Sequence, residues 1–101
     1  MSALSLPWTA EHARRRAERR LRDHVWPEAL HSAIERLEHG GHRVLLVGGS
    51  VRDVLLGRPA DRRWDLAADL PPAAVRERFE RTEGIGERHG TVLVLWEGLE
   101  I

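Results

Sequence analysis

A short apolar run followed by two glycines constrains the fold of this chain more than any other feature of its sequence. The run from Arg43 to Val47 is almost wholly apolar, which is typical of a β-strand buried on both faces. Gly48 and Gly49 follow it, and residues 50–56 have the composition of a short helix. A strand, a glycine turn and a helix in this order predict an α/β fold.

Helical and strand patterns alternate along the rest of the chain. The segment after Pro27 is the clearest helix, because its apolar residues recur at spacings of three and four and would form one buried face. Segment 90–96 is the clearest strand, and the Glu97-Gly98 pair behind it predicts a tight turn into a returning strand. The other predicted elements are a helix over 9–24, a strand over 62–68 and a helix over 71–81. Together they predict a mixed sheet with helices packed on it, a C-terminal antiparallel hairpin and a preceding N-terminal helix.

The charge of the chain is balanced overall but basic near the N-terminus. Sixteen arginines, with no lysine, offset sixteen acidic residues among 101, so net charge does not indicate a nucleic-acid ligand. The helix over 9–24 is rich in arginine and poor in apolar residues. It is interpreted either as a solvated helix with Glu–Arg pairs at helical spacing or as a contact with an RNA backbone. We therefore divide the chain into a basic helical segment, 1–25, and one further domain, 26–101.

Other compositional features narrow the class of protein. The chain has no cysteine, so it has neither a disulfide nor a thiolate metal site. The N-terminal residues do not resemble a signal peptide, and no apolar stretch approaches the roughly 20 residues of a membrane span. The six histidines do not have metal-ligand spacing. We expect a cytoplasmic protein that does not contact a membrane.

The glycine turn has the composition of a phosphate-binding site. Two glycines let the backbone turn sharply and let a ligand approach it closely. Ser50 could cap the following helix, whose unpaired N–H groups would then point at a ligand above the turn, and Arg52 could add a charge-assisted pair of hydrogen bonds. In the structural alternative the turn binds nothing, and Arg52 and Asp53 pair with neighbouring groups and fix the helix to the sheet.

The wider sequence around this turn resembles a known family. Besides "LVGGSVRDVLLGRP", the chain contains the helix end "LEHGGH", the segment "WDLAADLPPAAV" and the strand "HGTVLVL". Together, from Ala29 to Ile101, these motifs resemble the head domain of bacterial-type (class II) tRNA nucleotidyltransferases and related poly(A) polymerases. This family belongs to the polymerase-β-like nucleotidyltransferase superfamily, so the resemblance implies a nucleotidyltransferase-like sheet.

The resemblance also implies a reaction and a site. The reaction is the Mg²⁺-dependent addition of nucleotides to RNA 3′ ends, with ATP or CTP as the nucleoside triphosphate and RNA or tRNA as the partner. The phosphates would contact Gly48, Gly49, Ser50 and Arg52. Asp53 would hold these phosphate-binding residues in place without contacting the nucleotide itself.

One position departs from the metal site of that family. The family holds its metal ions with two carboxylates one residue apart on a strand, and such residues share a face with Cα atoms ~6.6 Å apart. At the matching positions this chain has Arg63 and Asp65. A guanidinium only donates hydrogen bonds and is always charged, so it repels a cation. Asp65 is therefore the one catalytic and metal-binding carboxylate that the resemblance leaves in place.

Two other carboxylates are candidates to replace the missing one. Asp61 precedes Asp65 by four residues, which on an unbroken strand is ~13 Å and too far for a shared pair of metal ions, unless a bulge shortens the segment. Glu100 could reach the site from a neighbouring strand, or it could be an outward charge on the hairpin. The candidate metal ligands are thus Asp65, Asp61 and Glu100.

Three functions remain open from the sequence. The family's nucleotide-selecting and tRNA-binding parts follow its head domain, and here the returning strand has only begun at Ile101. We therefore expect a partial head domain that is inactive alone. Arg63 favours two alternatives. One is a non-catalytic nucleotide- or RNA-binding module with the same fold, and the other is a structural remnant whose sheet is completed by a partner chain or in a dimer.

Overall fold

The computed structural model describes residues 10–59, 63–84 and 87–101, and it contains the predicted helices and strands in the predicted order. One two-residue strand and one 3₁₀ turn, over 87–89, were not predicted. The elements are α1 (Ala10–Asp23), α2 (Glu28–Glu38), β1 (Val44–Val47), α3 (Gly49–Leu55), β2 (Asp65–Ala68), α4 (Pro72–Glu77), β3 (Thr82–Glu83), β4 (Leu93–Trp96) and β5 (Leu99–Glu100).

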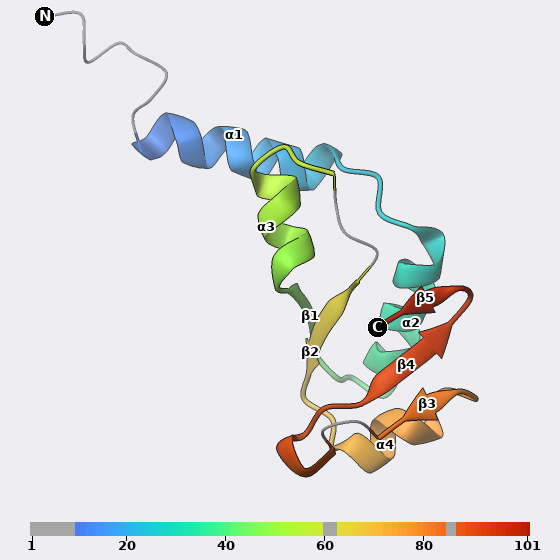
Figure 1. Cartoon of the computed structure of the whole chain (residues 1–101). Helices are drawn as coiled ribbons and strands as arrows, with labels where there is room; N and C mark the ends of the chain where they lie inside the picture. The colour runs from blue at the N-terminus through green and yellow to red at the C-terminus, as the bar shows by residue number, and fades with distance from the viewer. Residues whose placement is uncertain (1–9, 60–62, 85–86) are drawn as a thin grey trace, which may run out of the picture.

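The strands form two antiparallel sheets that are joined at one point. β1 pairs with β2, and β3, β4 and β5 form a second sheet in that order. A parallel bridge between Arg63 and Glu100 connects them, and the Trp64 N–H donates to the Glu100 carbonyl at 3.4 Å. The predicted α/β fold with its C-terminal hairpin is confirmed, and the mixed character of the sheet comes from this bridge (Figure 1).

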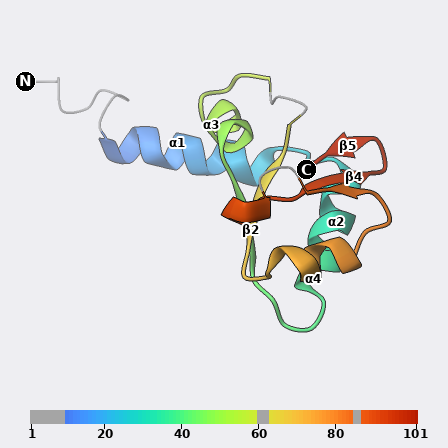
Figure 2. The same cartoon turned by 60° about the horizontal axis from the view of Figure 1, so that its bottom comes forward.

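The core lies between α2 and the second sheet. Leu37 and Ala33 of α2 pack with Phe79 and Val94, all four being buried. This confirms the apolar face predicted for the helix after Pro27. Figures 1 and 2 show α2 beside β4 and β5, and Figure 1 shows α4 beside β3.

The outer face of β1 is open, so the prediction of a strand buried on both faces is wrong. The exposed fraction is 66% for Leu45 and 38% for Val47, whereas Val44 packs against the core. β1 pairs only with β2 within the described residues, and the core covers one side of this two-stranded sheet. An apolar run indicates that a strand can be buried, but it does not show which elements are present to cover each face.

The basic helix α1 packs across α3 through a polar contact rather than an apolar face. None of its residues is buried. The Arg20 guanidinium donates to the Leu55 carbonyl at 2.9 Å and lies against Gly57, where an added Cβ would be 3.1 Å from the arginine Cζ. None of the helices in the described ranges is long and apolar enough to cross a membrane. The division of the chain near residue 25 stays a prediction.

Candidate functional site

The glycine turn connects β1 directly to α3. Gly48 is the N-cap residue of α3, with φ 83° and ψ −156°, a conformation that is essentially restricted to glycine. Its carbonyl already accepts the first helical hydrogen bond, from the Arg52 N–H at 3.2 Å. The N–H groups of the first helical turn have no partner within a helix. The turn therefore presents backbone donors immediately after the strand.

Asp65 lies directly against this turn. In the antiparallel register Asp65 is paired with Val47, the last residue of β1. A Cβ placed on Gly48 would be 2.7 Å from the Asp65 Oδ2 atom, so only glycine leaves room for the carboxylate. Two residues that were singled out for different reasons, one for phosphate binding and one for metal binding, are thus neighbours in the structure.

Ser50 does not cap the helix, which corrects the capping role predicted for it. Its side chain is buried, and its hydroxyl donates to the carbonyl of Arg63. α3 has no side-chain cap. The serine hydroxyl instead ties α3 to the segment before β2, so only the backbone N–H of Ser50 remains as a candidate phosphate ligand.

Arg52 and Asp53 pair with each other. The Arg52 Nη2 atom is 3.4 Å from the Asp53 Oδ1 atom, and the arginine side chain is 67% exposed. A Cβ on Gly49 would be 3.2 Å from the same Nη2 atom, so the guanidinium lies beside the turn. The pair lies within α3, so it does not fix the helix to the sheet as the structural alternative expected, and the role of Arg52 in phosphate binding stays a prediction.

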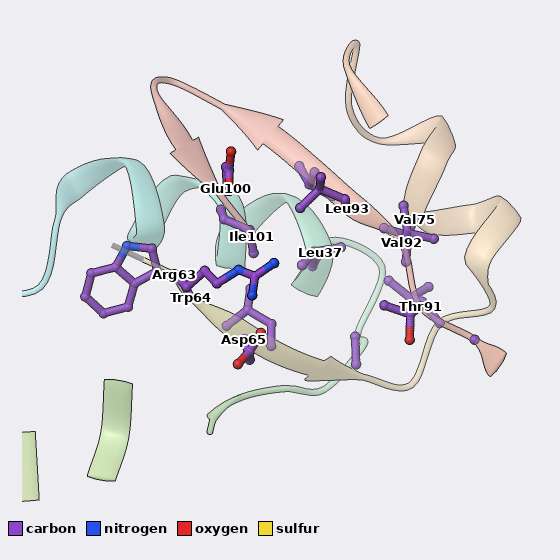
Figure 3. A pocket seen from close by; sticks show the side chains of 15 residues that line it. Leu37, Arg63, Trp64, Asp65, Val75, Thr91, Val92, Leu93, Glu100 and Ile101 are labelled. Atoms are coloured by element: carbon purple, nitrogen blue, oxygen red, sulfur yellow. The ribbon is translucent and has the colours of Figure 1, made fainter. Parts of the chain in front are cut away.

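A pocket of about 390 Å³ lies between β2 on one side and β4 and β5 on the other. Arg63, Asp65 and Glu100 supply its charged groups, while most of the remaining wall is apolar. In the view of Figure 3 the Arg63 side chain lies between the carboxyl groups of Asp65 and Glu100. Thr91 also lines the pocket. The sequence motif "HGTVLVL" was the signal that this segment matters, although no role was predicted for the threonine.

The described residues do not fit a pair of magnesium ions. Arg63 and Asp65 are both exposed and Trp64 between them is buried, so the arginine shares the carboxylate's side of the strand. Within the described residues, Arg63 and Asp65 do not form an ion pair. No group of three or more metal-binding side chains gathers anywhere in the described ranges. Asp61 lies outside the described residues, so its role stays a prediction.

Comparison with known proteins gives consistent relatives. A family model described as the poly A polymerase head domain matches residues 44–101. The CCA-adding enzyme of Bacillus pumilus is 44% identical over 66 residues, and that of Streptococcus thermophilus is 46% identical over 67 residues. These matches cover 65% and 66% of this chain but only 16% of each relative.

A solved structure is also similar to this one. The Bacillus stearothermophilus CCA-adding enzyme, in complex with CTP, has a TM-score of 0.70 and 36% sequence identity. The match covers 75% of this chain and 20% of that one. The chain therefore spans a small part of the proteins that it matches, and α1 precedes the segment that the family model covers.

Proposed function

The chain belongs to the poly(A) polymerase head-domain family, and from this premise we propose that it binds a nucleoside triphosphate at the turn formed by Gly48, Gly49 and Ser50. The nucleotide is of the ATP or CTP class. The reaction that the family resemblance assigns to such a site is the addition of nucleotides to an RNA 3′ end, with RNA or tRNA as the partner, and we expect this chain to be inactive in it alone. The similarity to a CCA-adding enzyme in complex with CTP supports this class of ligand.

The observation that carries the proposal is the glycine turn at Gly48, the N-cap residue of α3, which leaves no room for a Cβ. It sets backbone donors at the end of a strand, where an open α/β sheet binds its ligands. The N–H groups of Gly49 and Ser50 donate to phosphate oxygens, and the Arg52 guanidinium adds a positive charge. Asp53 holds that guanidinium beside the turn, at 3.4 Å.

Magnesium is the cofactor that the family resemblance implies, but the described residues offer it one well-placed carboxylate and a competing cation. Mg²⁺ prefers near-octahedral oxygen ligands and gives up its water reluctantly. The proposal therefore assigns phosphate binding to this chain and no step that passes through a metal. Arg63 favours a second candidate function, a non-catalytic nucleotide- or RNA-binding module that keeps the fold.

Nucleotide binding is tested by titrating CTP or ATP into the labelled chain and recording amide NMR signals. We expect the signals of residues 49–53 to shift at millimolar nucleotide, because phosphate oxygens accept hydrogen bonds from these N–H groups. Cytidine, which lacks phosphates, is the matched control and should leave them in place. If CTP moves none of these signals, or if cytidine moves them equally, the turn is not a phosphate site.

Nucleotide transfer is the second test. With tRNA lacking its 3′ end, Mg²⁺ and labelled CTP or ATP, we expect no extension of the RNA by the 101-residue chain. The reason is that Arg63 takes the place of a carboxylate which two-metal catalysis needs. Extension that depends on the chain, survives repurification and is abolished by Asp65→Asn would contradict this prediction.

A further inference from the structure

An arginine-rich groove lies between α1 and the C-terminal end of α3. Its volume is about 390 Å³, and the residues that line it are Arg16, Arg19, Arg20, Asp23, His24, Val54, Gly57 and Arg58. Four guanidinium groups and a histidine thus face one carboxylate. We call this feature the arginine groove. It is formed in part by α1, which lies outside the segment matched by the family model.

The arginines of α1 divide into paired and unpaired sets. Arg14 and Arg15 form ion pairs at helical spacing, with Glu18 at 3.7 Å and Glu11 at 2.8 Å. These pairs confirm part of the prediction of a solvated helix. Neither residue lines the groove.

The groove arginines are different. The Arg20 guanidinium donates a hydrogen bond to the Leu55 carbonyl, and its charge offsets the partial negative charge at the C-terminal end of α3. The side chains of Arg16, Arg19 and Arg58 form no ion pair or hydrogen bond with any other residue that the structure describes. Arg16, Arg19 and Arg20 are three and four residues apart, so they share one face of the helix. Like charges that outnumber their counter-charges repel one another, and a polyanion relieves this repulsion.

We propose that the arginine groove binds the phosphodiester backbone of a single RNA strand. Guanidinium groups match phosphate oxygens with two parallel hydrogen bonds, which makes arginine the preferred side chain for this contact. His24 lines the same groove, and its ring is held edge-on to Trp26 at 4.4 Å between centroids. A fixed aromatic ring beside phosphate ligands suits a strand whose bases are free to stack.

The composition of α1 disfavours a membrane as the ligand. A helix that binds a lipid surface inserts an apolar face. Apart from three alanines, Leu21 is the one apolar residue of α1, and the face that the helix turns toward the groove carries arginines. The choice of RNA among polyanions rests on the proposed function. The inference that the groove binds an anion rests only on its arginines.

The groove and the glycine turn lie at opposite ends of α3. The turn precedes Gly49, and the groove includes Gly57 and Arg58, beyond the last helical residue Leu55 (Figure 1). A seven-residue helix is ~10 Å long, and the two sites share no residue, so different substitutions test them. Binding of RNA and binding of nucleotide can therefore be measured independently.

The test is the binding of a fluorescent 12-nucleotide RNA by anisotropy, without metal or nucleotide, at several salt concentrations. Arg16→Gln/Arg19→Gln removes two groove cations from α1. Arg14→Gln/Arg15→Gln is the matched control, because it makes the same change of charge on the same helix outside the groove. Arg58→Gln removes a groove cation from the other wall and leaves α1 unchanged.

For the wild type we expect an affinity that falls with salt. For a single strand, each lost phosphate contact reduces the magnitude of the slope of log affinity against log salt by about 0.7. We therefore expect this slope to be smaller by about 1.4 in the groove double variant and by about 0.7 in Arg58→Gln. The affinity of the double variant at 50 mM salt should fall on the order of tenfold or more. The control should keep the wild-type slope, and circular dichroism should show the same helix content in all four proteins.

Several outcomes would overturn the inference. Equal losses in the control and the groove double variant would show that general charge, not the groove, binds RNA. If the wild type fails to bind RNA, or binds phosphatidylserine vesicles instead of RNA, the proposed ligand is wrong. If CTP shifts no amide signal while RNA binding still depends on Arg16, Arg19 and Arg58, only the proposed nucleotide site fails.

Discussion

Replacing Arg63 with aspartate is expected to raise the affinity of the chain for Mn²⁺ by ten- to a hundredfold. A unit charge ~6 Å from a divalent cation changes its binding by about tenfold even at the dielectric constant of water, and reversing the charge doubles the effect in free energy. The substitution also sets two carboxylates one residue apart on the strand that carries Asp65. Mn²⁺ is a convenient probe because it is paramagnetic and broadens nearby NMR signals.

The measurement compares the broadening of signals from residues 63–65 and from Ser50 as Mn²⁺ is added. We expect it at far lower concentrations in Arg63→Asp than in the wild type. Arg63→Gln removes the cation without adding a ligand, so it separates repulsion from coordination and should fall between the two. Adding Asp65→Asn to Arg63→Asp should reverse the gain. Equal broadening in wild type and Arg63→Asp would mean that Arg63 does not control metal binding.

Substituting Gly48 with alanine is expected to destabilise the fold and to displace the Asp65 carboxylate. The backbone conformation of Gly48 costs a residue with a side chain about 1–3 kcal/mol, before any contact is considered. The new Cβ would also lie 2.7 Å from the Asp65 Oδ2 atom, so one of the two must move. For a domain of this size the melting temperature should fall by on the order of 10 °C.

Two glycines serve as controls for Gly48→Ala. Gly49 lies inside the helix, and its Cβ would meet only the flexible end of Arg52, at 3.2 Å, so Gly49→Ala should be nearly neutral. Gly90 has a positive φ of 79° but nothing within 4 Å of the added Cβ, so Gly90→Ala reports backbone strain alone. Thermal unfolding of the three variants separates the two contributions. If Gly48→Ala is no less stable than Gly90→Ala, the contact with Asp65 does not constrain the turn.

The elements that depend on local pattern could be predicted from the sequence. The buried face of α2 follows from apolar residues at spacings of three and four, and Leu30, Ala33 and Leu37 are buried as expected. The hairpin follows from Glu97-Gly98, whose φ angles of 47° and 84° are those of a tight turn between antiparallel strands.

What the sequence could not predict depends on contacts between distant segments. The open face of β1 follows from the small size of its sheet. The two-residue strand β3 is too short to have a period of its own. Ser50 looked like a cap because of its place at the start of a helix, but a carbonyl 13 residues away accepts its hydrogen bond. The arginine groove needs α1 to pack on α3, and no periodic pattern encodes that contact.

For the candidate site, the sequence predicted candidate residues but not which of them lie close together in the fold. The glycine turn and Asp65 were predicted from separate motifs, and the antiparallel register of β1 and β2 brings them together. The position of Glu100 opposite Arg63 likewise depends on a single bridge between two sheets. Such a bridge leaves no trace in composition or spacing.

That bridge has a consequence for how this fold can change. The connections at positions 63 and 64 lead to α3 and to β5, the latter joining the two sheets, and on this segment they use main-chain atoms: the Arg63 carbonyl and the Trp64 N–H. The Arg63 side chain takes part in none of them and is exposed. A substitution at position 63 can therefore change the charge that faces the pocket while these main-chain connections stay in place.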